Sequence, residues 1–468
     1  MKSRFILGTA AALAVASLAA LTITGCGQGG VSGSTPGSGN GAAMVVTAGD
    51  APLSNILAAK VTISSMSLTP SGGGSNVTIL SQPRTIELSS LGAIQEPIET
   101  ENVAAGTYTS VNVTVSSATV TYVDSTGAVV NGTATISSPN DTVSLSPNLT
   151  VTQGQDVHLS LNFNLANSFD LTNSSVTFTP SITSVAASIE QENESDKQVE
   201  VTGSVVSVSS SSITVKSADS GVQSTFAINS STQFAAGITA AGINTGSIVT
   251  VRGTIQSDGS LLATMISAAM DGGAFGSGDA GGIGIVTAVT TDANNNVTSF
   301  TFVPRQEFSD MSGTSMTVSL SSSTTYGLSE GAISSGITAG SFTNAEIFPG
   351  QSVEVIGTAS SGSIAAQEVD LAPESLAVAL STTVSGTAPD YTFTLGLPTQ
   401  SFLTTMDSLT SLSASTNAQT EYEDGLTSTS FASLASGTAL EMHGYLLRDS
   451  SNNYSLTVSN VSQIESDN

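Results

Sequence analysis

One eight-residue pattern occurs three times in the second half of the chain. It begins and ends with glycine, and its fourth and sixth residues are apolar. It occupies residues 246–253, 350–357 and 437–444, with the same spacing between the glycines each time. Alternating apolar residues are typical of a strand with one buried face, and flanking glycines let that strand turn sharply. Because repetition of a pattern indicates repeated structural units, the sequence predicts three similar β units after residue 198.

A threonine and, two residues later, an aromatic residue precede each copy: Thr232 and Phe234, Thr324 and Tyr326, and Thr420 and Tyr422. We expect the ring to close one end of a small barrel whose wall contains the glycine-flanked strand. The barrels are predicted over residues 199–270, 283–373 and 380–468. Inserts near residues 327–347 and 399–415 make the second and third units longer and leave room for short helices.

The segment from residue 44 to residue 190 also alternates apolar and polar residues. Residues 111–115 and 157–161 show this period of two most clearly, with valine or leucine at every second position. Turn-forming pairs such as Asn131-Gly132 separate the runs and favour hairpins. An antiparallel β-sandwich is the simplest assembly of such strands. The polar and mostly acidic residues 190–198 are predicted to form a linker.

This first segment resembles a known bacterial family. Residues 50–52 (Asp-Ala-Pro), 105–108 (Ala-Gly-Thr-Tyr) and 161–165 (Leu-Asn-Phe-Asn-Leu) are similar to the domain of unknown function 4382, which is common in exported lipoproteins. Where that family usually has Asp-Phe-Asp, this chain has Asn162-Phe163-Asn164. If relatives bind a cation there, this chain would bind it more weakly. The resemblance implies architecture and location, and no activity.

The first repeat, residues 199–270, resembles a second family, the domain of unknown function 5666, which looks like a small closed β-barrel reminiscent of the OB-fold. The second and third copies fit that family less closely. The predicted fold class is therefore all-β, with an N-terminal antiparallel β-sandwich followed by three small OB-like β-barrel repeats.

The amino terminus has the layout of a secretory signal. Lys2 and Arg4 precede an apolar run, residues 5–23, that contains no charged residue. A plain transmembrane anchor is the alternative. Ile23-Thr24-Gly25-Cys26 resembles the bacterial lipobox, which implies that Cys26 receives a diacylglyceryl group and that the leader is cut before it. Residues 1–26 are therefore interpreted as a lipoprotein signal peptide that ends at its lipidation site.

Cys26 is the only cysteine, so a lipid on its sulfur leaves no thiol for a disulfide. Gly27 follows it, where an aspartate would resemble a signal for retention in the inner membrane. The expected location is outside the cytoplasm, with the chain lipid-anchored on the outer membrane or the cell surface. Residues 27–43 are nearly all small and are predicted to form a flexible tether with a reach of roughly 20 to 25 Å.

The charge balance argues against nucleic acid as a partner. The chain has 9 Lys and Arg against 36 Asp and Glu, and removal of Lys2 and Arg4 with the leader leaves 7 against 36, or −29. Such a surface repels phosphate backbones. OB-type barrels often hold nucleic acid, but that function needs basic residues and stacking aromatics. Arg252 stands nearly alone in its barrel.

One stretch matches the Gly-x-Ser-x-Gly elbow of serine hydrolases. It places Ser329 within residues 327–331, and Asp390 or Asp407 with His443 would follow in the order of a triad. The elbow requires a parallel strand that turns abruptly into a helix, whereas this stretch follows a predicted barrel strand. Serine and glycine are also abundant, so a chance match is the preferred interpretation and no catalytic residue is assigned.

No metal or cofactor site is predicted. His158 and His443 lie far apart in the sequence, and both are expected on outward faces of strands. Residues 271–279, 292–296 and 449–453 are oxygen-rich loops that could bind calcium loosely. Asp and Asn are also the residues that hairpin turns need, and turns are the preferred interpretation.

Glu96, Glu99 and Glu101 form a local group of carboxylates that could imitate the pair of a glycosidase. They occupy a loop-like stretch in which nothing fixes their separation. A solvated acidic loop is therefore predicted.

These observations favour a non-enzymatic protein of the envelope or surface, whose sandwich and barrels act as spacers and contact surfaces. The expected partners are the membrane, through lipid on Cys26, and another envelope protein or a polymer. The alternative is a module that binds a ligand or cation, such as polysaccharide or calcium. An enzyme is the third hypothesis.

Overall fold

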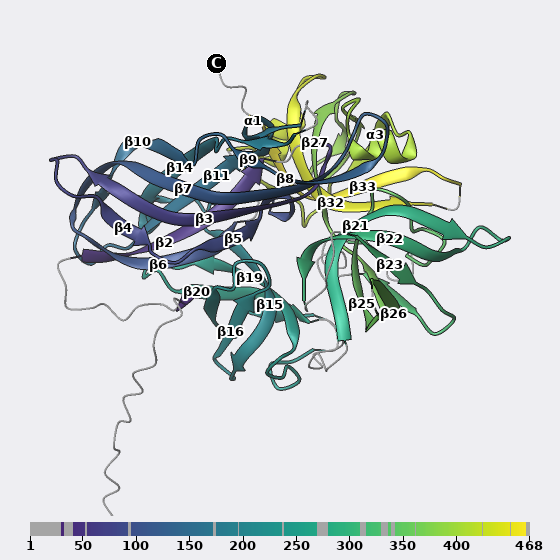
Figure 1. Cartoon of the computed structure of the whole chain (residues 1–468), viewed down its shortest axis with the longest axis horizontal. Helices are drawn as coiled ribbons and strands as arrows, with labels where there is room; N and C mark the ends of the chain where they lie inside the picture. Colours follow the sequence, from purple (N-terminus) through teal and green to yellow (C-terminus); the bar gives the residue numbers. More distant parts are fainter. Residues whose placement is uncertain are drawn as a thin grey trace, which may run out of the picture.

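The structure is a computed structural model, and it describes residues 30–31, 41–51, 54–91, 95–171, 175–194, 196–235, 238–268, 279–308, 315–328, 336–337, 342–360, 362–423, 425–449 and 451–464. Strands are by far its commonest secondary structure and its helices are short, which confirms the predicted all-β fold (Figure 1). The predicted signal and Cys26 lie outside the described residues. Within the described ranges, no helix combines the length and the apolar character needed to span a bilayer.

The first unit is a β-sandwich. Its strands are β2 (Gly41–Ala51), β3 (Ile56–Pro70), β4 (Val77–Leu80), β5 (Arg84–Glu87), β6 (Glu96–Ala104), β7 (Gly106–Val123), β8 (Val129–Thr133), β10 (Asn140–Val151), β11 (Val157–Asn164) and β14 (Ile182–Ser188). One sheet has the order β10-β7-β3-β4, with β5 beside β3 and β8 beside β7, and the other has the order β14-β11-β2-β6.

One pairing between the main strands of the sandwich departs from the predicted antiparallel arrangement. β2 and β11 run parallel, with Val157 opposite Met44. The first strand of the unit is inserted between β6 and β11, and it pairs antiparallel with β6. Alternation within a strand does not reveal the direction of its neighbour, so the sequence could not indicate this pairing.

The core of the sandwich follows the period of two. Val111, Val113 and Val115 of β7 share one interior with Leu159 and Leu161 of β11, and all five are at most 1% exposed. Full burial of such a side chain stabilises the fold by roughly 1.5 to 3 kcal/mol. Short elements complete the unit: η1 (Leu88–Ser90), β9 (Thr135–Ile136), α1 (Leu165–Ser168), β12 (Phe169–Asp170), β13 (Thr177–Phe178) and η2 (Ile189–Gln191).

Three barrels follow the sandwich. Barrel 1 contains β15 (Gln198–Val208), β16 (Ser212–Ser217), β17 (Gln223–Ala227), β18 (Gln233–Phe234), β19 (Ile248–Ile255) and β20 (Leu261–Ala268). Barrel 2 contains β21 (Asp279–Thr291), β22 (Val297–Glu307), β23 (Met316–Ser319), β24 (Thr325–Leu328), β25 (Ser352–Ser360) and β26 (Ser363–Leu371). Barrel 3 contains β27 (Glu374–Leu380), β28 (Ser385–Thr387), β29 (Asp390–Gly396), α3 (Phe402–Asp407), β30 (Ser411–Ser415), β31 (Glu421–Tyr422), α4 (Ser428–Phe431), β32 (Ala439–Arg448) and β33 (Tyr454–Gln463).

The five main strands of each barrel are connected in the same way. The first pairs with the second and the fourth, the third pairs with the second, and the fifth pairs with the fourth. A parallel pair between the third and fifth strands closes each ring: β17 with β20, β23 with β26, and β30 with β33. A five-stranded barrel with such crossing connections is the architecture of the OB-fold.

The glycines of the repeated pattern have two structural roles. The first of each copy has a left-handed backbone, with φ of 86° at Gly246 and 92° at Gly350 and Gly437. The second lies at a β-bulge between the fourth and fifth strands. A Cβ would lie 2.5 Å or less from a carbonyl oxygen of the fifth strand at each of them, Gly253, Gly357 and Gly444. The turn and the bend therefore both require glycine.

The threonine that precedes each copy also has a defined partner. Its hydroxyl donates to a backbone carbonyl oxygen of the fifth strand. The distance is 2.8 Å for Thr232 and Thr420 and 2.9 Å for Thr324. The aromatic residue two positions later is half-buried and packs against the barrel core. These contacts hold a short strand parallel to the fifth strand in every barrel.

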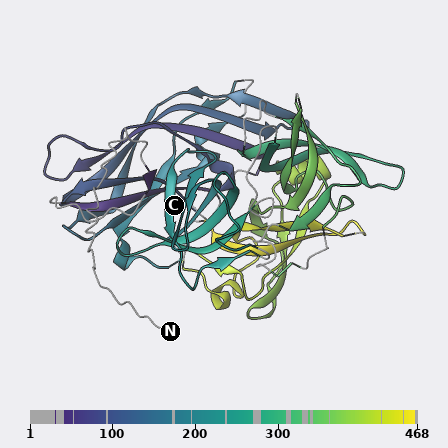
Figure 2. The same ribbon diagram turned by 90° about the horizontal axis from the view of Figure 1, so that it is seen from below.

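The sandwich and the barrels pack as one body (Figures 1 and 2). Barrel 1 lies along one side of the sandwich, and barrels 2 and 3 lie at one of its ends. One apolar cluster joins Leu57 and Val123 of the sandwich to the interior of barrel 3 and to Ile285 and Val303 of barrel 2. Val45 of the sandwich belongs in the same way to the apolar cluster of barrel 1.

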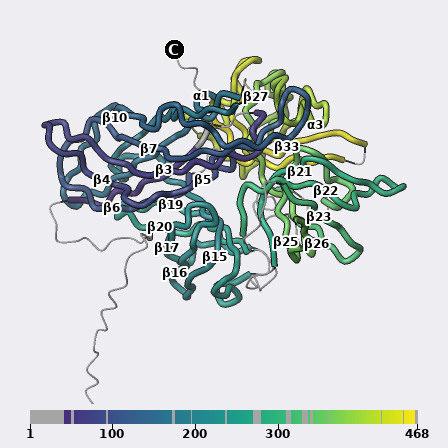
Figure 3. The backbone as a smooth tube through the Cα atoms, in the orientation of Figure 1, coloured from purple at the N-terminus to yellow at the C-terminus, as the bar shows by residue number. Residues whose placement is uncertain are grey.

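Two segments predicted to be free are packed in part. From the predicted tether, β1 (Gly30–Val31) pairs with β17, which Figure 3 labels, and β2 already begins at Gly41. Residues 27–29 and 32–40 of the tether lie outside the described ones. Beside the predicted linker, Ile189 is fully buried in η2. The insert at residues 399–415 contains α3, whereas that at 327–347 lies largely outside the described residues.

Candidate functional site: a charged junction between the β units

Charged side chains meet where the sandwich, barrel 2 and barrel 3 come together. We call this group the junction: Lys60 and Glu87 of the sandwich, Arg305 and Glu307 of barrel 2, and Glu374 of barrel 3. Because the whole chain has 9 Lys and Arg residues, two of them in one place make the junction the strongest candidate for a site. No sequence motif marks it.

Local strand geometry places these side chains. Lys60 and Glu87 are cross-strand partners on β3 and β5, so they share the outer face of the sandwich. In barrel 2, Pro304 and Gln306 of β22 pair with consecutive residues of β21, which leaves Arg305 as the extra residue of a β-bulge. A bulge redirects a side chain out of the regular alternation. Glu374 is the first residue of β27.

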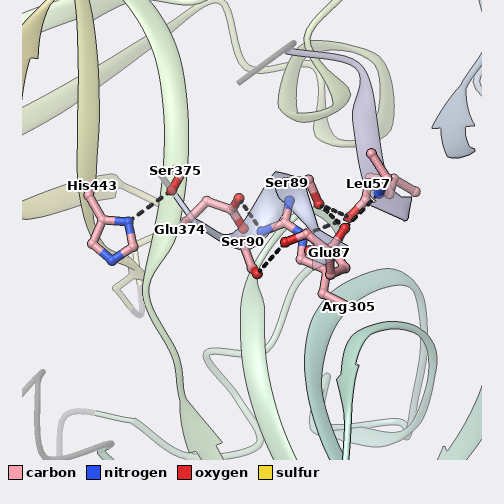
Figure 4. Close-up of polar contacts among 9 residues, drawn as sticks. Leu57, Glu87, Ser89, Ser90, Arg305, Glu374, Ser375 and His443 are labelled. Atoms are coloured by element: carbon pink, nitrogen blue, oxygen red, sulfur yellow. Dashed lines mark hydrogen bonds and ion pairs between the residues drawn. The ribbon is translucent and has the colours of Figure 1, made fainter. Parts of the chain in front are cut away.

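Arg305 bonds to two other units at once (Figure 4). Its Nε donates to the carbonyl oxygen of Leu57 in the sandwich at 2.6 Å, and its Nη1 donates to Oε1 of Glu374 in barrel 3 at 2.9 Å. Burial raises the pKa of Glu374, and the adjacent guanidinium opposes that rise. Because a guanidinium offers its donors in a rigid plane, this contact fixes the relative position of three units.

Glu87 is bonded within its own unit. Its Oε1 accepts from the backbone N–H of Ala59 at 2.6 Å and from the hydroxyl of Ser89 at 2.7 Å, and the hydroxyl of Ser90 donates to its carbonyl oxygen at 3.3 Å (Figure 4). Both serines belong to η1, the helical turn that follows β5. Ser89 of the turn and the backbone of β3 therefore each donate to a carboxylate that is fully buried.

Lys60 and Glu307 connect the sandwich to barrel 2 near the surface. Nζ of Lys60 lies 3.3 Å from Oε1 of Glu307, and the side chains are 32% and 28% exposed. Burial alone would lower the pKa of Lys60, but Glu307, Asp219 and Glu87 together hold it above the usual value. The lysine therefore stays charged and balances several carboxylates.

Barrel 1 adds a carboxylate to the edge of the junction. Burial, with the neighbouring Glu96 and Glu87, raises the pKa of Asp219 well above its usual range. Burial also raises the pKa of Glu96, which accepts a 2.6 Å hydrogen bond from the hydroxyl of Ser220. The chemistry of the group is that of an internal brace, because its ion pairs connect one unit to another.

The side chain of His443 faces away from the interior of its own barrel, to which the neighbouring Met442 contributes, but it is not solvated. It is 5% exposed, and its Nδ1 lies 2.8 Å from the hydroxyl of Ser375 (Figure 4). Burial, with Arg252 and Arg305 nearby, lowers its pKa to about 3. The side chain points out of its own barrel, but neighbouring units cover it.

The considered triad is not assembled by the described residues. Asp390 is exposed at the start of β29, and Asp407 lies beside Tyr454 at the end of α3. The histidine nitrogen that a triad aspartate would orient faces Ser375 instead. Ser329 lies outside the described residues.

His158 is also buried rather than solvated, contrary to the prediction. It is 1% exposed, with Nε2 at 2.8 Å from the hydroxyl of Thr47 and Nδ1 at 3.0 Å from Oε1 of Glu192. Glu192 follows η2, so the acidic segment after the sandwich packs over this strand. The predicted linker thus has a packing role.

The carboxylates at 96, 99 and 101 are not a solvated loop. They lie on β6, where Glu96 and Glu99 are 3% and 8% exposed and Glu101 is exposed. Oε2 of Glu99 lies 3.0 Å from Nη2 of Arg84. Each buried carboxylate has its own structural partner, which does not resemble a pair arranged around a glycosidic bond.

The oxygen-rich loops that the structure describes are hairpin turns. Oδ1 of Asp292 accepts from the backbone N–H of Asn294 and Asn296 at 2.8 and 2.9 Å, and Asp449 does the same for Ser451 and Asn453. The side-chain amide of Asn453 lowers the pKa of Asp449 most, and the backbone bonds lower the pKa of both aspartates. Within the described ranges, no group of three or more His, Cys, Asp or Glu side chains is placed to hold a metal ion. Residues 271–278 lie outside those ranges.

Comparison with known families gives the domain content. Residues 42–180 match the family described as Domain of unknown function (DUF4382), and residues 202–267 match Domain of unknown function (DUF5666). In the first match, Asn164 caps α1 by accepting from the N–H of Asn167 at 3.0 Å. No curated protein is similar enough to this chain to count as a match.

Among solved structures, the chain is similar to the wild-type single-stranded DNA binding protein from Thermus aquaticus and to a deletion mutant of that protein. The identities are 13% and 14%, the matches cover 41% and 40% of this chain and 94% and 95% of those chains, and the TM-score is 0.15 in both cases. A likeness this distant carries no argument about fold or ligand.

Proposed function

We propose that this chain is a lipid-anchored, non-catalytic protein of the bacterial envelope that presents one rigid body of four β units to another envelope protein or a polymer. The observation that carries this proposal is the guanidinium of Arg305, which bonds to the sandwich and to barrel 3 while its side chain is 4% exposed. Independent barrels on flexible linkers would have no need for an arginine shared by three units. Fixed spacing and contact are what such a body provides.

The chemistry of the candidate residues supports a non-catalytic role. The carboxylates of Glu87 and Glu374 are fully buried and bonded within the body, so a substrate cannot reach them. With a pKa of about 3, His443 is a poor proton acceptor at neutral pH. The glycines of the repeated pattern serve the backbone of the barrels.

The proposed membrane attachment is through lipid on Cys26. A single acyl chain gives marginal and reversible binding, whereas two or more make release slow. Gly27 at the next position supports the outer membrane or the cell surface as the location. The excess of 36 Asp and Glu over 9 Lys and Arg supports the proposal that nucleic acid is not a partner.

Metabolic labelling with an alkyne fatty acid tests the anchor. We expect the wild-type protein to carry label and to sediment with membranes, and the Cys26→Ser variant to do neither. Ser32→Ala, a substitution in the same segment, is the matched control and should keep both properties. Label that persists in Cys26→Ser would overturn the lipid assignment.

Small-angle scattering and turnover assays test the rigid, non-catalytic body. A compact chain of this length has a radius of gyration of roughly 22 Å, whereas strung-out units give a much larger value. We expect the compact value and no turnover on panels of esters and glycosides. An extended particle would contradict the rigid body, and turnover lost in Ser329→Ala would contradict the non-catalytic role.

One observation favours a second candidate, the binding of a ligand. A cleft lies beside the exposed ion pair of Lys60 and Glu307, between two units of the body. Clefts between domains are frequent binding sites. Calcium has no such support, because the carboxylates of the described turn loops accept bonds from their own backbone.

A further inference from the structure

A cleft of about 400 Å³ separates the outer face of the sandwich from the end of β22. Its lining includes Lys60, Thr119, Thr121, Asn131, Thr133 and Glu307. We propose that this cleft, here called the platform cleft, binds a neutral, hydroxyl-rich ligand of oligosaccharide size. The proposal goes beyond the anchored body and does not depend on lipid at Cys26.

The floor of the platform cleft is a regular array of polar side chains. Thr119 of β7 lies opposite Lys60 of β3 on one side and Thr133 of β8 on the other. The neighbouring row on the same face runs through Thr121 and Asn131, whose side chains are joined by a 2.7 Å hydrogen bond. Adjacent strands lie about 4.8 Å apart, so hydroxyl and amide groups recur at short intervals across this face of the sheet.

The ion pair at the edge of the array offers a ligand hydroxyl group both a hydrogen-bond donor and an acceptor. The ammonium of Lys60 and the carboxylate of Glu307 lie 3.3 Å apart, and about a third of each side chain is exposed. A ligand hydroxyl can accept from the ammonium and donate to the carboxylate at once, so neither charge loses a partner. Ala58 and Pro304 also line the cleft and add apolar atoms to it.

Charge selects a neutral ligand. The carboxylates of Glu307, Glu87 and Asp219 all raise the pKa of Lys60, and they would repel an anion bound beside it. A cation would have to displace Lys60, whose pKa those same carboxylates hold above its usual value. An uncharged polyol meets neither obstacle, and its many hydroxyls match the donors and acceptors of the floor.

A second hollow shares Glu307 with the platform cleft. It has a volume of about 300 Å³ and is lined by Ser204, Lys216, Ser217 and Phe308 together with Glu307. Glu307 therefore borders both hollows, between the sandwich and barrel 1. Pockets of roughly 300 to 1,000 Å³ suit small ligands, so both hollows have a volume in the range of a binding site.

Calorimetric titration of the detergent-solubilised full-length protein tests the proposal. The probes are neutral tetrasaccharides (cellotetraose, maltotetraose and the N-acetylglucosamine tetramer), the anionic tetragalacturonate and calcium chloride. We expect saturable binding of at least one neutral probe and tighter binding of it than of the charged probes. The absence of saturable binding by every neutral probe, or preferred binding of tetragalacturonate or calcium, would overturn the proposal.

Variants locate the site. Glu307→Gln and Thr133→Val are each expected to weaken binding, the first by about tenfold, as expected for a lost hydrogen bond to a charged group. Thr133 is exposed at the edge strand, so its substitution should leave the fold intact. The matched control is Glu194→Gln, at an 85% exposed glutamate that also pairs with a lysine. Equal affinity of all three variants and wild type would contradict the platform cleft.

Discussion

Arg305 on β22 and Glu374 on β27 form an ion pair across the boundary between barrels 2 and 3, with 2.9 Å between Nη1 and Oε1. The side chains are 4% and 0% exposed, so solvent does not weaken the contact. A buried pair of this kind contributes little net stability relative to apolar residues, but its loss on one side is costly. The pair is therefore better understood as a device that fixes how the units fit.

Loss of one partner of this pair should destabilise the protein strongly. Glu374→Leu leaves the guanidinium of Arg305 buried without its counter-charge, which costs about 3 to 5 kcal/mol. Arg305→Met with Glu374→Leu should recover most of that loss. Urea unfolding measures both, with Glu194→Gln, at an 85% exposed glutamate that pairs with a lysine, as the control. A single variant no less stable than this control would show that the pair is solvated.

Stability should fall as pH rises through the titration of Glu354. Burial, with Asp370 and Glu368 nearby, raises its pKa from 4.5 to about 8. Between these values the folded chain holds a proton that the unfolded chain has lost, so the free energy of unfolding decreases as pH rises. Glu354→Gln should flatten this decline and gain most stability at pH 8 and above. Thermal midpoints from pH 5 to pH 9 test this, and a slope unchanged from wild type would contradict it.

His443 should remain neutral throughout the physiological range. Its pKa of about 3 means that its ring resonances should not move between pH 5 and pH 8 in an NMR titration. The His443→Gln variant assigns the signal. A transition near pH 6.5 would mean that the ring is in contact with water, and would reopen the question of a catalytic base.

The second glycine of each repeated pattern should not tolerate alanine. At Gly357 a Cβ would lie 2.1 Å from the carbonyl oxygen of Ala365, so the bulge must open. We expect Gly357→Ala to cost roughly 1 to 3 kcal/mol or more, as overpacked substitutions do. Gly72→Ala is the control, because a Cβ there has nothing within 4 Å. Equal unfolding midpoints for the two variants would contradict the steric argument.

The sequence alone was sufficient to predict the structural features that recur in the three barrels. Identical spacing of glycines, alternation of apolar residues and Asp or Asn in turns each have one local cause, and the structure contains the turns and bulges they indicate. β6 shows the limit of local patterns. Its run of glutamates has a low strand propensity, yet pairing with β2 and with Arg84 makes it a strand.

The candidate site could not be predicted because it depends on contacts between units. His158 and His443 do point out of their own cores, but both are buried: Glu192 of the next segment contacts His158, and Arg252 and Arg305 of the other two barrels lie near His443. An outward position therefore does not mean an exposed one. Arg305 likewise reaches Leu57 and Glu374 from a β-bulge, and no spacing rule in the sequence marks a bulge without glycine.

The pairing of Gly30 with Gln223 sets a limit on the height of the body above a bilayer. Gly30 comes four positions after Cys26, and four extended residues span at most about 14 Å. If Cys26 is lipidated, barrel 1 is the unit nearest the headgroups, and the remaining units acquire a fixed orientation above them. Residues inserted within 27–29 would then increase the distance between the whole body and the bilayer, whereas residues inserted within 32–40 would not. Energy transfer to labelled lipid measures this distance. An equal effect at both places would mean that Gly30 is not held at β17.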